Sequence, residues 1–151
     1  MNKRLRGVVI DIMIHFCVGF IGWGLIYLGF NNMLYSLFFL IGAIFIDIDH
    51  FIDYFLYYGL SFNPIKFFKL EYLASEKAYV FFHSWELFAI MFSLSIIFNL
   101  NYLFFFSLGV AIHLSCDSLY RVKPLFYCLI YRAYHNFNAR KICPECLGDI
   151  I

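Results

Sequence analysis

Charged residues and prolines are scarce in this 151-residue sequence, and each scarcity excludes a class of protein. Charged residues make up 14% of the chain, against about 25% in a typical soluble domain. The net charge of +1 lacks the basic excess of nucleic-acid-binding proteins, so we expect no nucleic-acid partner. Three prolines against 21 phenylalanines and 12 tyrosines exclude a disordered chain. Five cysteines without a secretory cleavage pattern predict no disulfide framework.

Hydrophobic residues are abundant, at 64% of the chain, and the mean hydropathy is +0.80. A helix needs about 20 apolar residues to cross a bilayer. Four runs approach this length, at residues 7–30, 33–57, 79–100 and 102–119, and a shorter run at residues 124–134 is expected to lie at the membrane interface. The sequence therefore predicts one all-α domain over residues 1–151. This domain is an integral membrane helical bundle with four transmembrane helices, a short interfacial C-terminal helix and a cytoplasmic tail over about residues 121–151.

The lysines and arginines alternate between the segments that connect the predicted spans. Three precede the first span, three lie between the second and third, and five follow the fourth, while the two intervening turns have none. Because lysines and arginines accumulate in the short loops on the cytoplasmic side of a membrane, both termini are expected in the cytoplasm. We therefore predict a multi-pass protein of the inner or plasma membrane, with the lipid bilayer as its surroundings.

Ionisable side chains interrupt all four predicted spans. A charged group at the centre of a membrane helix costs about 2.5–3.5 kcal/mol on insertion scales, and such groups are functional by default. In the predicted orientation, the first and third spans begin at the cytoplasmic side and the second and fourth end there. All of these residues then lie at one depth in the cytoplasmic half of the bilayer, which predicts one shared site. They are Asp11, His15, Asp47, Asp49, His50, Asp53, His83, Glu86, His113 and Asp117.

Imidazole and carboxylate groups together form the ligand set of zinc, manganese and iron. His113 and Asp117 are four residues apart and share one helix face, as do Asp11 and His15. Asp11 also has a simpler interpretation, as a first-turn residue among the lipid headgroups. We expect a divalent metal cofactor, with zinc first and manganese or iron as alternatives.

The second predicted span carries the densest group of candidate ligands. Asp49, His50 and Asp53 fall within about 100° of helical arc, and Asp47 lies about 60° beyond His50. This spread suits two metal ions better than one, since carboxylates from facing helices build di-metal centres in helical bundles. The predicted metal ligands are His15, Asp49, His50, Asp53, His83, His113 and Asp117.

Three weaker patterns have interpretations that require no chemistry. Cys143 and Cys146 form a lone C-x-x-C pair, half of a structural zinc site, which we interpret as incidental. Glu86 is open to two interpretations, as a site residue or as a capping or ion-pairing residue with Lys77 or Lys123. The first span contains glycines that permit close helix approach, namely Gly19, Gly22, Gly24 and Gly29.

The arrangement of these motifs resembles a known family. A histidine in the first span is followed by Asp47-x-Asp49-His50, then by His83-Ser84, and then by His113-x-x-x-Asp117. Over residues 8–120 this resembles the bacterial and archaeal membrane-bound predicted metal-dependent hydrolases, named for LexA regulation and an inner-membrane location. More distantly, the His/Asp set is similar to that of zinc-dependent phospholipases C and their nuclease relatives. Many members of the family carry a His-Arg pair shortly before the His-Ser, where this chain has residues 78–80 as Ala-Tyr-Val, which suggests a subfamily.

The leading hypothesis is a membrane-embedded metal-dependent hydrolase that cleaves a phosphoester or ester of a lipid-type substrate through metal-activated water. Asp47, Asp49 and Ser84 receive catalytic roles. Asp47, or whichever carboxylate stays off the metal, orients the water or accepts its proton. Asp49 or Asp53 bridges or completes the metal shell, and Ser84 hydrogen-bonds the substrate or a carboxylate beside the metal. Arg121 and Lys123 are predicted to bind an anionic headgroup of the substrate at the cytoplasmic interface.

A metal or proton transporter that uses the same His/Asp cluster is the main alternative. Transporter sites lie near the bilayer midplane, at broken helices in related repeats. Here the cluster is offset to one side and no repeat is visible, although an oligomer could supply the missing path. A haem protein is disfavoured by the number of aspartates, and a non-catalytic membrane accessory protein with a polar core is the remaining alternative.

Overall fold

The computed structural model describes residues 3–120 and 124–143. Within these ranges the regular structure is helical, apart from one isolated β-bridge between Lys77 and Asn138, and the predicted all-α fold class is confirmed. The elements are α1 (Lys3–Phe30), α2 (Met33–Ile44), η1 (Phe45–Asp49), α3 (His50–Tyr58), α4 (Pro64–Phe68), η2 (Glu71–Ser75), α5 (Trp85–Ile97), α6 (Asn101–Tyr120), η3 (Pro124–Tyr127), α7 (Leu129–Tyr134) and α8 (Ala139–Ile142).

Three helical segments in the described ranges are long and apolar enough to cross a membrane: Arg6–Phe30, Met33–Tyr58 and Asn101–Leu119. They correspond to the first, second and fourth predicted spans. The third prediction was too long, because the helix there begins only at Trp85. Its 13 residues reach about 20 Å, less than the hydrocarbon thickness of about 30 Å.

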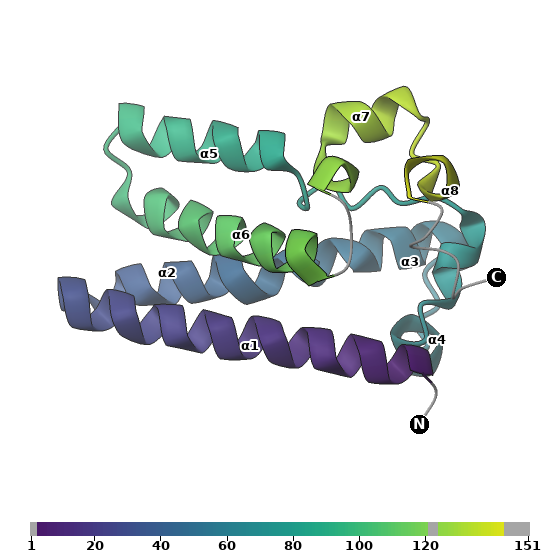
Figure 1. Cartoon of the computed structure of the whole chain (residues 1–151), viewed down its shortest axis with the longest axis horizontal. Helices are drawn as coiled ribbons and strands as arrows, with labels where there is room; N and C mark the ends of the chain where they lie inside the picture. Colours follow the sequence, from purple (N-terminus) through teal and green to yellow (C-terminus); the bar gives the residue numbers. More distant parts are fainter. Residues whose placement is uncertain (1–2, 121–123, 144–151) are drawn as a thin grey trace.

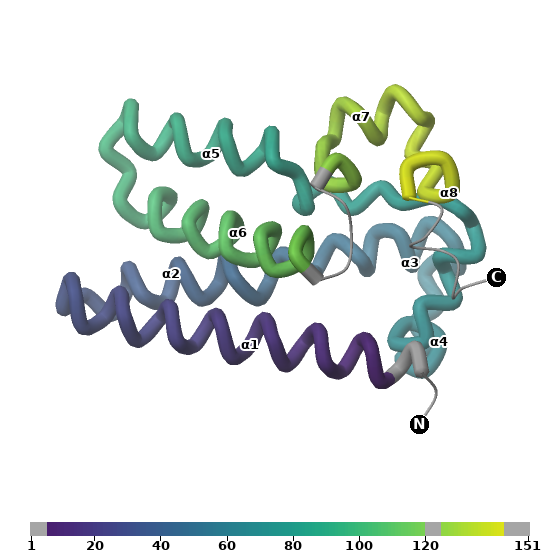
Figure 2. Tube along the Cα trace, in the orientation of Figure 1, coloured from purple at the N-terminus to yellow at the C-terminus, as the bar shows by residue number. Residues whose placement is uncertain are grey.

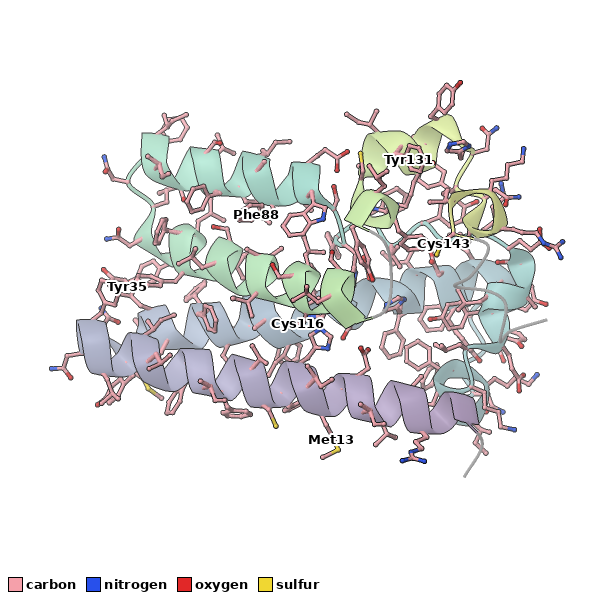
Figure 3. The ribbon with its side chains drawn as sticks, in the orientation of Figure 1. Met13, Tyr35, Phe88, Cys116, Tyr131 and Cys143 are labelled. Atoms are coloured by element: carbon pink, nitrogen blue, oxygen red, sulfur yellow. The ribbon has the colours of Figure 1, made fainter. Side chains whose placement is uncertain are left out.

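The helix surfaces away from the bundle are apolar. On α1, Leu25 is 66% exposed and Leu28 is 81% exposed. Met13, on the same helix, points away from the other helices (Figure 3). Water would disfavour such a surface, whereas lipid tails would solvate it. The exposed surface therefore agrees with membrane association.

The long helices form two antiparallel hairpins, one of α1 with α2 and one of α5 with α6 (Figure 1). Helix α2 packs against both α1 and α6, and α5 packs on the far side of α6. Figure 2 shows the tight turns at one end of the bundle, whereas α3, α4, α7 and α8 cluster at the other. Asn31 closes the first turn with a φ of 49°, a conformation that asparagine tolerates well. Asn32 then caps α2 by accepting hydrogen bonds from the Leu34 and Tyr35 amides.

Two glycines bring α2 and α6 into backbone contact. A Cβ atom on Gly42 would collide with the Phe106 carbonyl, and one on Gly109 would collide with the Phe39 carbonyl. Of the glycines expected to serve this purpose on α1, two face α2. A Cβ on Gly22 would collide with the Phe39 ring, and one on Gly19 would lie 3.3 Å from Ile44 Cγ1. A Cβ at Gly24 or Gly29 would meet nothing within 4 Å, so for these two positions the prediction was wrong.

The helix that begins with α2 changes its winding at Phe45–Asp49, which form the 3₁₀ segment η1, before it continues as α3. A 3₁₀ helix has three residues per turn, so residues three apart lie one above the other. The change in winding therefore rotates the side chains of η1 away from the positions of a continuous α-helix. This rotation brings Asp47 and His50 to one face.

Candidate metal centre

Six ionisable side chains converge where the two hairpins meet the clustered short helices. Five of them come from α1, from the η1–α3 junction and from α6, and the sixth precedes α5. They form two groups, one of His15, His113 and Asp117 and the other of Asp47, His50 and His83. Within each group, one ligand atom per residue lies within 4.8 Å of the others. The groups meet where His83 Nε2 lies 3.1 Å from His113 Nε2.

The carboxylates of Asp47 and Asp117 lie at distances from the imidazoles that are typical of the ligands of one metal ion. Asp47 Oδ1 is 3.1 Å from His83 Nε2, 3.4 Å from His113 Nε2 and 3.6 Å from His50 Nε2. Asp117 Oδ2 is 3.5 Å from His113 Nε2 and 3.7 Å from His83 Nε2. In a tetrahedral zinc site with bonds of about 2.0–2.2 Å, neighbouring ligand atoms are separated by about 3.3–3.6 Å. A cation among these atoms would therefore need little rearrangement.

Hydrogen bonds at Nδ1 determine which nitrogen of each imidazole faces the cluster. His113 Nδ1 donates to the Ala43 carbonyl at 2.9 Å, and His15 Nδ1 donates to the Asp11 carbonyl at 2.9 Å. Since a carbonyl oxygen can only accept, Nδ1 must carry the proton in both rings. In the neutral rings, Nε2 then presents a lone pair to the cluster. This is the tautomer that a metal-binding histidine needs.

The lone pairs of His83 and His113 face one another. His83 Nδ1 is hydrogen-bonded to Asp49 Oδ2 at 3.1 Å, and the carboxylate is the acceptor because an ionised carboxylate carries no proton to donate. With Nδ1 protonated in both neutral rings, the two Nε2 atoms present lone pairs to one another at 3.1 Å, an arrangement that a cation among them would stabilise. His15 Nε2 is buried, forms no hydrogen bond and lies 3.2 Å from Asp117 Oδ1. The unpartnered His15 nitrogen and the facing nitrogens of His83 and His113 can all serve as ligands of a metal ion.

The centre is closed on one side and open on the other. The side chains of His15, His83, His113 and Asp117 are at most 6% exposed. Asp47 is 38% exposed and His50 is 34% exposed. A substrate or water molecule would therefore reach the centre beside Asp47, the more exposed of its two carboxylates.

Asp49 and Asp53 lie outside both ligand groups, although the sequence made them candidate ligands. Asp49 Oδ2 accepts hydrogen bonds from the amides of Phe82 at 2.8 Å and His83 at 3.2 Å. Asp53 accepts from the Tyr79 amide at 3.1 Å. Both carboxylates bind the turn over residues 79–83. In this arrangement they orient a ligand and do not themselves supply a donor atom to the two groups.

Ser84 and Glu86 connect α5 to α7. The Ser84 hydroxyl donates to Glu86 Oε2 at 2.9 Å and accepts from the Leu87 amide at 3.2 Å, so it caps α5. Glu86 accepts from the Leu129 amide at 2.8 Å, and its hydrogen bond raises the pKa of the Cys128 thiol. Of the two interpretations that the sequence left open for Glu86, a site residue or a capping residue, the structure thus favours the capping residue.

The other predicted residues fall partly outside the described ranges. Arg121, Lys123 and Cys146 lie outside the described residues. Cys143 is buried at the end of α8 and is disulfide-bonded. The Asp11 carboxylate lies 4.0 Å from His15 Nδ1, and its backbone carbonyl accepts from that nitrogen.

We expect Glu86→Gln to destabilise the fold by about 1–3 kcal/mol, because the α7 amides lose a charged acceptor. Thermal unfolding in detergent would measure the loss, and hydrogen exchange should accelerate first at Leu129 and Ile130. Glu71→Gln is the matched control, since Glu71 contacts only Tyr58 among the hydrogen bonds of the described side chains. Equal stability of the two variants would contradict this role for Glu86.

Three residues around the centre were not found by the sequence reasoning. The Tyr72 hydroxyl lies 3.4 Å from His50 Nδ1, and the Tyr127 ring stacks on His83 with centroids 5.7 Å apart. Arg132 is fully buried, although it was counted only among the cytoplasmic charges. A single arginine inside the short apolar run of residues 124–134 was the available signal for Arg132.

Four imidazoles and two carboxylates form a donor set for zinc, manganese or iron. Comparisons with known protein families, with curated proteins and with solved structures find no match for this chain. Such a donor set, partly open and set among apolar helices, can hold one or two divalent cations and admit a further ligand at Asp47.

Proposed function

We propose that this protein is an integral membrane hydrolase that depends on a divalent metal and cleaves a phosphoester or ester of a lipid-type substrate. The observation that carries the proposal is the pair of imidazole acceptors, His83 and His113, at 3.1 Å between two carboxylates. Their proton-bearing Nδ1 atoms are held by Asp49 and by the Ala43 carbonyl. Catalytic metal sites combine this preorganisation with an open position.

Each group of the centre would hold one ion, with zinc expected and manganese or iron as alternatives. A bound divalent ion lowers the pKa of a water molecule toward about 7 and polarises an ester oxygen. Asp47 lies on the open side, where it can orient the attacking water or accept its proton. Asp49 keeps the His83 imidazole in the required tautomer.

The position of the centre along the helices favours a substrate that enters from one leaflet. The ligands on α1, η1–α3 and α6 lie about 14–19 residues, or roughly 21–28 Å, from the turns at Asn31 and Asn99. In a hydrocarbon core of about 30 Å, they lie beyond the midplane. With both termini in the cytoplasm, as the basic residues indicate, this depth is on the cytoplasmic side. Arg121 and Lys123 would then bind an anionic headgroup of the inner leaflet.

The metal content of the detergent-purified protein tests the centre directly. We expect about two equivalents of zinc or manganese by mass spectrometry, because the ligands form two groups. The double variant His113→Ala, Asp117→Ala should lose this metal, whereas Glu71→Gln should retain it. A wild-type protein that binds no metal even after reconstitution would contradict the proposal.

Cleavage and uptake assays on the metal-loaded protein then distinguish hydrolysis from transport. Phosphoester and ester lipids in mixed micelles should be cleaved by the metal-loaded wild type and not by the double variant. Metal-dependent uptake into liposomes without cleavage of any such lipid would favour the transporter and overturn the hydrolase.

A further inference from the structure

Arg132 on α7 is buried against the turn that carries His83. One terminal nitrogen of its guanidinium, Nη1, donates to the carbonyls of Tyr79 at 2.8 Å and Val80 at 2.9 Å. The other, Nη2, donates to the His83 carbonyl at 2.8 Å. The side chain is 0% exposed and, among the described residues, forms no ion pair. Burying a cation that bonds only to backbone carbonyls costs desolvation free energy. We therefore expect Arg132 to have a specific role at this turn.

The turn that Arg132 holds is strained and is bound from both sides. Val80 has a φ of 27°, a conformation that disfavours a β-branched side chain. Asp53 accepts from the Tyr79 amide, and Asp49 accepts from the His83 amide. Carboxylates therefore bind the N–H groups of this turn while the guanidinium binds its carbonyls. Strained segments of this kind persist only where surrounding contacts determine them, and they cluster at functional sites.

These contacts leave the His83 side chain little freedom. Its carbonyl is held by Arg132, and its amide and Nδ1 are held by Asp49. Its Nε2 atom is then directed at Asp47 and His113. Without Arg132, the Tyr79 and His83 carbonyls would lose the guanidinium donor and the Val80 carbonyl would keep only the His83 amide, so the turn would rearrange.

We propose that Arg132 is a positioning residue of the metal centre, which acts by holding the His83 turn, and that the segment Pro124–Ile142 thereby forms part of the centre. This inference rests on the metal-dependent function proposed above. Backbone hydrogen bonds also join this segment to residues 76–78, which directly precede the turn. The Ala78 amide donates to the Phe137 carbonyl at 3.0 Å, and the Ala139 amide donates to the Glu76 carbonyl at 2.8 Å. Arg132 is the member of this segment that contacts the backbone of a proposed ligand.

The test compares Co²⁺ binding by Arg132→Met with that by Arg140→Met. Arg140 is a matched control, because it lies on the same segment but pairs with Glu76 at 2.9 Å and is 58% exposed. We expect Arg132→Met to bind Co²⁺ about 10–100-fold more weakly, the usual cost of losing a group that orients a ligand. The visible Co²⁺ spectrum at saturation should change as an imidazole leaves, while Arg140→Met should match the wild type. A purely structural residue would lower the unfolding temperature without changing this spectrum.

A double-variant cycle with His83→Ala determines whether Arg132 acts through His83. In the His83→Ala background, Arg132→Met should cost no further Co²⁺ affinity, because the ligand that it positions is gone. Additive losses would overturn the inference, as would wild-type affinity and spectrum in Arg132→Met. A wild type that binds no Co²⁺ would instead contradict the centre itself. If Arg132→Met does not fold, Arg132→Lys replaces it in the cycle, since one ammonium cannot serve all three carbonyls in the guanidinium geometry.

Discussion

Replacing Asp117 with asparagine is expected to abolish metal-dependent hydrolysis and to weaken zinc binding by at least about 100-fold, more than the loss of a group that only orients a ligand. Asp117 places Oδ1 3.2 Å from His15 Nε2 and Oδ2 3.5 Å from His113 Nε2, so one carboxylate serves two imidazoles. Asparagine has nearly the same shape, but its amide is neutral and only its oxygen can bind a cation. The loss should therefore be electrostatic, with the helices unchanged.

Zinc titration and circular dichroism of the same preparations would measure this effect of Asp117→Asn. Glu71→Gln makes the same chemical change outside the two ligand groups and should leave zinc affinity at the wild-type value. If Asp117→Asn retained full activity and full zinc affinity, Asp117 would not be a ligand. If it lost its helical signal, His113→Ala would take its place, because it removes a different donor from the same group.

Replacing Gly109 with alanine is expected to destabilise the bundle by about 3 kcal/mol or more, near the upper end of overpacking effects. In an exposed helix the same change would stabilise by about 1 kcal/mol, since alanine has the higher helix propensity. Here the added Cβ would collide with the Phe39 carbonyl and would lie 2.8 Å from the Ala43 amide nitrogen. Backbone atoms of α2 cannot move aside as a flexible side chain would.

Unfolding in detergent would measure this loss, with Gly24→Ala as the control. A Cβ at Gly24 meets nothing within 4 Å, so this variant should be neutral or slightly more stable than the wild type. Gly109→Ala should also weaken the metal centre, because the Ala43 carbonyl accepts from His113 Nδ1 across the same contact. A Gly109→Ala protein as stable as Gly24→Ala would show that α2 and α6 do not approach this closely.

The sequence alone was sufficient for properties that depend on composition and on residues near one another in the chain. Scarce charges and long apolar runs predicted the helical fold class and four membrane spans, of which three correspond to helices long and apolar enough to cross a membrane. The spacing of His113 and Asp117 placed them on one face, since an α-helix repeats every 3.6 residues. The interruption of several apolar runs at similar depths predicted that their polar residues would meet. These features are local, and no tertiary contact is needed to derive them.

Only the tertiary structure decided which carboxylates face the ligand cluster. In a continuous α-helix Asp47 would lie about 60° of arc from His50, but the 3₁₀ winding of η1 aligns these two residues and turns Asp49 toward the residue 79–83 turn. That turn replaced the first part of the expected third span, because Ser84 caps α5 there and the helix begins only at Trp85. Its buried partner, Arg132, comes from about 50 residues further along the chain. Such choices depend on which backbone groups remain unpaired when the helices pack, and a sequence pattern does not contain that information.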